Sequence, residues 1–328
     1  MSEIRPDPIL QVATGFLAAK SLFVASEVGL FECLADGAAT LDAVARRTKV
    51  PPRTLRIITD AMVALGLVQR QGNQYRNGPA AGTFLSGRTP ADLRPFLRLW
   101  NHVSYPRWMK LEEAVRTDRI VYGEFTSEEQ QLYSEGVEAV TRGTAEALAT
   151  TYEFGQHRRV LDLGGGTGSF LTATLSHHHR VEATLYDLPA VAVATRRRLS
   201  DGPFANRLRI VQGDFFKDPI PDGHDAVLIA NVVHCFPRAP VLELLRRTRH
   251  RVAAGARLLL VDFWTDETRT QPTFAALMAG EFLLTPGGGD VYSVEEAREW
   301  LQETGWRQIE FRPLAGPASV IVAVAVTS

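Results

Sequence analysis

Cysteine is scarce in this chain of 328 residues, which contains only Cys33 and Cys235. Two cysteines build no disulfide framework, and so low a content is typical of proteins from a reducing compartment. Long apolar runs are missing as well. No run reaches the roughly 18 residues that a membrane-spanning helix needs, and Met1–Pro6 lacks the apolar core of a signal peptide. We therefore expect a soluble protein of the cytoplasm without a membrane partner.

An excess of charge of either sign is also lacking. The formal net charge is −1 at neutral pH, so bulk electrostatics favours neither nucleic acid nor a membrane surface as a partner. The histidine cluster His177–His179 is typical of a solvated helix end. The sequence has no cysteine cluster and no His-x-x-x-His spacing, so we expect no metal site.

Residues 1–90 have the pattern of a winged-helix domain. Thr40 is a suitable N-cap for a short helix that Val50–Pro52 ends, and a second helix runs from about Arg53 to Leu65. Residues 67–76 then predict a hairpin with a polar turn. The basic residues around the turn between the helices are Arg46, Arg47, Lys49, Arg53 and Arg56.

A winged helix can bind DNA, or it can serve in packing and dimerisation. The second helix carries no cluster of Asn, Gln or Ser for reading bases, and a complete ligand-binding domain follows it. We therefore interpret residues 1–90 as a dimerisation domain that binds no nucleic acid. A ligand-sensing transcription regulator is the alternative.

Residues 91–150 predict helices that link this domain to the rest of the chain. Trp100, Tyr105 and Trp108 lie in this linker. Aromatic side chains at such a place can line a pocket for a flat substrate or belong to the core. Phe274, Met278 and Phe282 recur at four-residue spacing on one helical face and leave the same two interpretations.

Residues 151–328 alternate strands with helices, which favours an α/β domain with a Rossmann-like, doubly wound sheet. The short Pro/Gly connector between the last two strands predicts a hairpin, and hence an antiparallel strand at one edge. The predicted strands are 159–163, 181–186, 207–212, 225–231, 257–263, 308–313 and 318–325, with helices centred near 172, 193, 245 and 298.

The run VLDLGGGTGSF, residues 160–170, places glycines directly after a buried strand. Without Cβ atoms, the backbone at Gly164 and Gly166 can approach a nucleotide-like ligand closely. Such a loop can bind a nicotinamide dinucleotide or S-adenosylmethionine. The dinucleotide fingerprint G-x-G-x-x-G fails because Ser169 holds the sixth position from Gly164. Asp162 suits a ligand with a free ammonium, which favours S-adenosylmethionine.

The next two strands also end in acids. Asp187, followed by Leu188, lies about 20 residues beyond the glycines, the spacing of a ribose-binding acid. After the third strand, Asp214 can accept from the exocyclic amine of adenine, while Phe215 and Phe216 supply aromatic faces. Because ligands bind outside the carboxyl ends of parallel strands, we expect these residues to form one cofactor site.

The fourth and fifth strands supply candidates for catalysis. Asn231, a further cofactor-binding candidate, and His234 follow the fourth strand, and Asp262 ends the fifth. A histidine can take the proton of a phenol, which is worth roughly 10²–10⁴-fold in rate. A carboxylate beside it fixes the tautomer and raises the basicity of the ring. Asp262 and Asp290, the latter on a glycine-rich loop, are the two candidate orienting acids.

Taken together, VLDLGGGTG, LYDLP, GDFF, the histidine loop and TPGGGD-x-YS resemble the plant-type and bacterial small-molecule O-methyltransferases, such as caffeic acid and isoflavone O-methyltransferases. The resemblance covers nearly the whole chain. It implies an intertwined homodimer formed through the N-terminal domain, and S-adenosylmethionine as the methyl donor, with S-adenosylhomocysteine as its product.

The resemblance also implies roles for individual residues. His234 is the general base, Phe236 takes an aromatic position beside the adenine, and Thr141 matches a hydroxyl position near the methionine carboxylate. Gly164, Asp187, Asp214 and Phe215 hold the cofactor. The chain departs from the family at Cys235, which replaces an aspartate, at Ala230, which replaces a lysine, and at Asp262 and Asp290, which replace glutamates of plant members.

We predict an S-adenosylmethionine-dependent O-methyltransferase that methylates a hydroxyl of a small aromatic natural product without a metal ion. The alternatives are an enzyme of the same fold that methylates nitrogen, sulfur or carbon or transfers no methyl group, and the winged-helix regulator.

Overall fold

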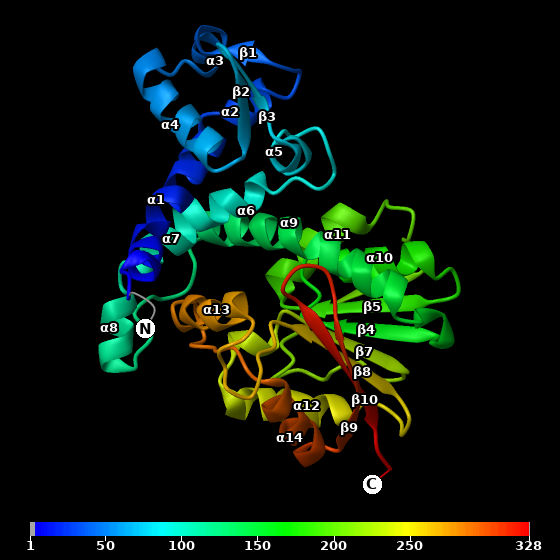
Figure 1. Ribbon diagram of the computed structural model, residues 1–328. Coiled ribbons are helices and arrows are strands. Elements are labelled where there is room, and N and C mark those ends of the chain that lie inside the picture. Colours follow the sequence, from blue (N-terminus) through cyan, green and yellow to red (C-terminus); the bar gives the residue numbers. More distant parts are fainter. Residues whose placement is uncertain (1–3, 328) are drawn as a thin grey trace. The chain divides into compact units, whose positions relative to one another are not determined.

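The computed structural model describes residues 4–327. Met1–Glu3, part of the segment in which no signal peptide is expected, lies outside the described residues. The chain divides into two compact units (Figure 1). The first contains the residues up to Pro106 together with Ser127–Val140, and the second contains Arg107–Thr126 and the chain from Thr141 onward. The predicted linker 91–150 is thus shared between the units.

The first unit has the winged-helix pattern that the sequence predicts. Thr40 caps helix α3, because its side chain accepts a hydrogen bond from Ala43 N at 3.3 Å, and Pro52 occupies the first turn of α4. The strands form an antiparallel sheet in the order β1-β3-β2. The elements are α1 (Asp7–Glu27), α2 (Leu30–Cys33), β1 (Ala39–Thr40), α3 (Leu41–Thr48), α4 (Pro52–Ala64), β2 (Val68–Gln71), β3 (Gln74–Asn77) and α5 (Pro79–Phe84).

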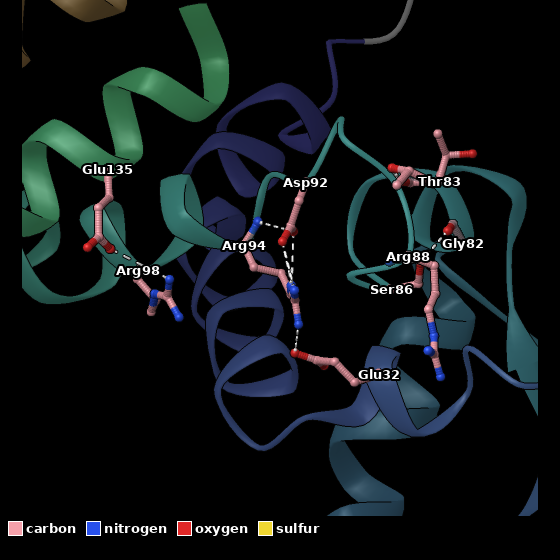
Figure 2. A network of polar contacts seen from close by, with 10 residues as sticks. Glu32, Gly82, Thr83, Ser86, Arg88, Asp92, Arg94, Arg98 and Glu135 are labelled. Carbon is pink, nitrogen blue, oxygen red and sulfur yellow. Dashed lines mark hydrogen bonds and ion pairs between the residues drawn. The ribbon is translucent and has the colours of Figure 1, made fainter. Parts of the chain in front are cut away.

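A partly buried ion-pair network joins α2 to the helix that follows α5. The Arg94 guanidinium donates to both carboxylate oxygens of Asp92, at 2.9 and 2.7 Å, and to Glu32 at 2.5 Å (Figure 2). These bonds fix the start of α6 (Arg94–Leu99), since a guanidinium binds a carboxylate at two points. A π-helical turn (Trp100–Ser104), α7 (Tyr105–Trp108) and the long helix α9 (Ser127–Thr151) follow, and α6 and α9 share an ion pair between Arg98 and Glu135 at 3.8 Å.

Helix α1 is long and apolar, and a single such helix near the N-terminus is weak evidence for a membrane span. It has 21 residues, and a window of 18 of them has a mean hydropathy of 1.5, so by length and composition alone it could cross a membrane. Gln11 and Lys20 interrupt its apolar residues, so it contains no uninterrupted apolar run of that length. Five of its large apolar side chains are each more than half exposed in the single chain: Ile9, Leu10, Val12, Phe16 and Leu17.

The second unit is a seven-stranded sheet in the order β6-β5-β4-β7-β8-β10-β9. The neighbouring pairs from β6 to β8 are parallel, which confirms the predicted α/β class with its doubly wound sheet. Its strands are β4 (Arg159–Leu163), β5 (Glu182–Asp187), β6 (Leu208–Gln212), β7 (Ala226–Ala230), β8 (Arg257–Asp262), β9 (Trp306–Pro313) and β10 (Ser319–Ala325).

Helices cover both faces of this sheet. One face packs against α12 and α14 around Leu161, Ile229 and Leu260, and the other packs against α9 and α10 around Val160, Leu228 and Leu259. Because strands β4 and β7 are covered on both sides, they are apolar at successive positions rather than at alternate ones. The helical segments are α8 (Leu111–Thr117), a 3₁₀ turn (Phe154–Gln156), α10 (Ser169–His177), α11 (Pro189–Leu199), a 3₁₀ turn (Val233–Cys235), α12 (Arg238–Arg249), α13 (Thr273–Leu283) and α14 (Val294–Glu303).

The predicted hairpin of the last two strands is present, but its antiparallel strand does not lie at the edge. Strand β10 pairs antiparallel with both β8 and β9, so the edge strand β9 runs in the same direction as β8. The burial patterns give the reason. Residues 320–323 of β10 are all buried, whereas β9 buries Trp306 and leaves alternate side chains exposed, as an edge strand can.

Candidate active site

Glycines form the turn from β4 into α10. Gly164, Gly166 and Gly168 have φ values of 74°, 53° and 84°, a region that residues with a Cβ rarely adopt. A Cβ on Gly164 would also lie 2.7 Å from Val232 Cγ2. The loop can therefore pass close to the segment after β7 only with glycine, and its backbone faces the carboxyl edge of the sheet.

Asp162 lies beneath this loop and is 1% exposed. Neither of its carboxylate oxygens has a hydrogen-bond partner in the described part of the chain. Burial and, to a smaller extent, the nearby Asp187 carboxylate together raise the pKa of Asp162 to about 8. A buried carboxylate without a partner is costly, so this side chain suits a cationic ligand group such as an α-ammonium.

Asp187 joins the end of β5 to the glycine loop. One carboxylate oxygen accepts from Gly166 N at 2.7 Å, and the other accepts from Leu188 N at 2.7 Å. Burial raises the pKa of Asp187, although these two bonds act in the opposite direction. A carboxylate offers about four acceptor positions, so two remain for the adjacent hydroxyls of a ribose.

An aromatic cluster follows β6. The rings of Phe215, Phe216 and Phe236 meet edge to face, with centroids 4.7 to 6.1 Å apart. Asp214 accepts from Phe216 N at 2.9 Å and pairs with Lys217 at 3.1 Å, and the first of these bonds contributes most to lowering its pKa. The structure thus brings the predicted adenine-binding residues together from two loops.

Two other predicted cofactor residues lie on separate elements. Asn231, at the end of β7, has a left-handed φ of 56° and donates from its backbone N to Val261 O at 2.9 Å. Such a conformation is uncommon outside glycine and tends to occur at functional sites. Thr141 lies on α9 where the chain enters the second unit.

His234 and Asp262 form a buried pair. His234 is 4% exposed and Asp262 is 2% exposed, and Nδ1 lies 2.6 Å from Asp262 Oδ1. The backbone N of His234 also donates to Asp262 Oδ2 at 3.3 Å. Burial lowers the pKa of His234, but the charges of Asp262 and Cys235 outweigh it and raise the pKa to about 10. We infer the tautomer with Nδ1 protonated, since this proton makes the bond to the carboxylate.

Asp290, the other candidate orienting acid, does not occupy that place. Its Oδ2 accepts from Arg269 at 2.8 Å, and its Oδ1 accepts from the backbone N of Val291 at 2.8 Å. The glycines before it support the histidine loop instead. A Cβ on Gly289 would lie 1.8 Å from His234 O, and one on Gly287 would lie 2.6 Å from Cys235 O.

Helix α13 supplies aromatic and apolar side chains next to the histidine. Phe282 stacks on His234 with the ring centroids 3.8 Å apart and the planes at 13°. Met278 is buried on the same helix, and Phe274 is 42% exposed. The Trp108 indole N–H donates to Glu281 at 2.5 Å and its ring lies over Gly280.

Trp100 and Tyr105 belong to the first unit, so they are described there. Trp100 meets Phe96 edge to face with centroids 5.6 Å apart, and Tyr105 meets Phe23 at 6.4 Å. The sequence analysis did not single out Phe263, whose ring lies 5.8 Å from that of His234. Its position directly after a strand-end acid was the available signal. In residues 4–327, no group of three or more His, Cys, Asp or Glu side chains is arranged to hold a metal ion.

A glycine loop with acids at successive strand ends defines a nucleoside-binding α/β protein, and the buried His–Asp pair beside it indicates an enzyme. Comparison with known proteins identifies its family. Residues 108–307 match the O-methyltransferase domain, and residues 10–87 match the O-methyltransferase dimerisation domain. The chain therefore belongs to the O-methyltransferase family and is an S-adenosylmethionine-dependent O-methyltransferase.

The relatives cover nearly the whole chain. A 3-hydroxy-5-methyl-1-naphthoate 3-O-methyltransferase of Streptomyces sahachiroi is 29% identical over 96% of this chain and 93% of its own length. The N,N-dimethyltransferase OxyT of Streptomyces rimosus is 30% identical over 91% and 90%. Among solved structures, human N-acetylserotonin methyltransferase in complex with SAM has a TM-score of 0.90 at 25% identity, with 99% of both chains covered.

Proposed function

We propose that this enzyme methylates a hydroxyl of a small aromatic natural product, with His234 as the general base and Asp262 as its orienting acid. The observation that carries the proposal is the buried 2.6 Å contact between these two side chains, on the loops that follow β7 and β8. Asp262 holds Nδ1, which leaves Nε2 to take the proton of the acceptor hydroxyl as its oxygen is methylated.

The cofactor site fits S-adenosylmethionine. Asp162 offers a buried carboxylate to the ammonium, Asp187 has acceptor positions for the ribose, and the backbone at Gly164 and Gly166 leaves room for the ligand. The other residues assigned to this site are Thr141, Leu188, Asp214, Phe215, Phe216, Asn231 and Phe236. When bound, the cofactor supplies a methyl group on a sulfonium, an electrophile that needs only a positioned nucleophile.

The acceptor site that we propose is apolar and aromatic. Phe274, Met278 and Phe282 lie on α13, and Trp108 packs against the same helix. Trp100 and Tyr105, which belong to the first unit, stay predictions from the sequence. Several similar proteins are named for hydroxylated aromatic substrates, including the naphthoate and N-acetylserotonin methyltransferases.

We propose further that two copies associate through the N-terminal domain and that the enzyme works in the cytoplasm. The match to a dimerisation domain covers α1 beyond its first turn, and a second copy would cover the exposed apolar side chains of this helix. A lipid surface or DNA is not the proposed partner. Two of the basic residues of the winged helix are already paired, since Arg56 contacts Asp60 at 2.9 Å and Arg47 donates to Cys33 O at 2.7 Å.

The experiment combines calorimetric titration with S-adenosylmethionine and a screen of hydroxylated aromatic acceptors by product mass. We expect one cofactor per chain, and methylated product from wild type. His234→Ala should keep the cofactor affinity within about twofold and lose turnover by about 10²-fold or more, while the exposed His250→Ala serves as the matched control. Unchanged turnover in His234→Ala would remove the histidine from catalysis.

Two further experiments test the alternative functions. Primary and secondary aromatic amines in the same screen test transfer to nitrogen, the activity that OxyT is named for. A gel shift with genomic DNA at several salt concentrations tests the regulator, because binding driven by phosphate contacts weakens steeply with salt. Salt-sensitive DNA binding without cofactor binding would overturn the proposal.

A further inference from the structure

The ring of Phe282 lies flat on the imidazole of His234. The centroids are 3.8 Å apart, the planes differ by 13°, and both side chains are about 4% exposed. Phe263 is the next aromatic neighbour, but its ring is 5.8 Å from His234 and tilted by 30°. Phe282 therefore covers one face of the imidazole, whereas Asp262 holds it at one edge.

Contacts before and after Phe282 in the sequence fix the last turn of helix α13. Glu281 accepts from the Trp108 indole at 2.5 Å, and Gly280 lets the Trp108 ring approach, since a Cβ there would lie 3.0 Å from the ring. After Phe282, the side chain of Thr285 donates to Phe282 O at 2.9 Å. These contacts fix the last turn of α13, from which the Phe282 ring stacks on His234.

The charges around His234 come from several elements. Asp262 faces it from the end of β8, and Cys235 is its neighbour on the same loop. Glu281 on α13 is engaged by Trp108, and Asp290 on the glycine loop is engaged by Arg269. Phe282 contributes no formal charge, but the face of an aromatic ring is negative and attracts a cation placed over it.

We propose that Phe282 is a positioning residue for His234, whose ring fixes the plane of the imidazole and stabilises the imidazolium formed on proton uptake. The bond to Asp262 alone permits rotation of the imidazole about the Nδ1–oxygen direction, and the stacked ring removes this freedom. The acceptor hydroxyl then meets Nε2 along the open edge of the ring. The catalytic part of this inference rests on the proposed general-base role.

The test measures the pKa of His234 in the cofactor-free protein. Its ring signals are recorded by NMR of ¹⁵N-histidine-labelled enzyme, and comparison with His234→Gln assigns them. Phe282→Leu keeps the site apolar but removes the aromatic face, so the pKa should fall by about one. Phe282→Tyr should keep the wild-type pKa. Phe311→Leu is the matched control, because Phe311 lies on β9, a strand that carries none of the residues assigned to the site.

A second series avoids any loss of packing. Fluorinated phenylalanines placed at position 282 keep the ring shape and withdraw electrons from its face, so the pKa should fall stepwise with each added fluorine. A pKa that stays at the wild-type value in Phe282→Leu and across the fluorine series would overturn the inference. This readout needs neither cofactor nor acceptor, so it is separate from the test of methyl transfer.

In active enzyme, the same variants should split the kinetic constants. On the alkaline plateau of the pH profile, where the ring of His234 is neutral in every variant, Phe282→Leu should lower kcat about tenfold with little change in KM for the cofactor, and Phe282→Tyr should restore kcat. Equal losses in Phe282→Leu and Phe282→Tyr would show a packing role only and would contradict the proposal.

Discussion

Replacing Asp262 by asparagine should move the pH dependence of methyl transfer. In wild type the pKa of His234 is raised to about 10, so at pH 7 the ring is neutral, and able to accept a proton, in roughly one molecule in a thousand. The rate should therefore rise nearly tenfold per pH unit between pH 7 and 9 and level off near 10. Asparagine carries no charge, so Cys235 alone still opposes the effect of burial and the pKa of His234 falls well below that of wild type.

Asp262→Asn should consequently show a profile that levels off at a lower pH than in wild type, with a plateau lower by roughly 10²–10⁴-fold because the tautomer is no longer fixed. The assay measures kcat of both enzymes from pH 6 to 10.5 at saturating cofactor. If the phenolic acceptor ionised without the help of His234, kcat would rise with pH in the same way in both enzymes. An alkaline rise that survives in Asp262→Asn would refute the reasoning, as would a wild-type rate that is constant from pH 6.5 to 9.

The same pair affects stability with a definite sign. The folded pKa of His234 lies above its unfolded value near 6.5, so the stabilisation is complete below pH 6.5 and is lost as the pH rises towards 10. The free energy of unfolding, measured with urea, should fall over this interval in wild type. In Asp262→Asn the same fall should be absent.

Three other substitutions test separate parts of the structure. Because the pKa of Asp162 is about 8, cofactor binding at pH 7 should release close to one proton, measured by calorimetry in buffers of different ionisation enthalpy, and Asp162→Asn should release none. Gly289→Ala would place a Cβ 1.8 Å from His234 O, so we expect a melting temperature several degrees lower and at least tenfold less activity, whereas Gly123→Ala meets nothing within 4 Å and should be neutral. Phe16→Asp, at a side chain 55% exposed in the single chain, should shift the mass measured by light scattering from dimer to monomer, while the exposed Ile309→Asp on β9 should leave it unchanged.

The sequence predicted those parts of the fold and site that depend on local patterns. Buried strands appear as continuous apolar runs, and a glycine run directly after such a strand is visible without a structure. The pairing of His234 with Asp262 was also predictable, because the carboxyl ends of adjacent parallel strands meet at one edge of a sheet.

The parts that could not be predicted depend on partners distant in the chain. Asp290 was an equal candidate until Arg269 was seen to hold it, and the left-handed φ of 59° at Arg269 leaves no mark in the sequence. The stacking of Phe282 on His234 needs the end of α13 to reach the loop after β7, and helical spacing alone could not distinguish this from core packing. The place of β10 inside the sheet follows from comparing its burial with that of β9.

The position of β10 has a consequence for how the enzyme is made. Ser319, the first residue of β10, stands opposite Asp262 in the antiparallel pairing with β8. The strand that carries the orienting acid therefore has no partner on that side until the segment 319–325, the last strand of the sheet to leave the ribosome, has been synthesised. A substitution that disrupts the pairing of β10 with β8 should therefore disturb the end of β8 that carries Asp262 more than the glycine loop after β4.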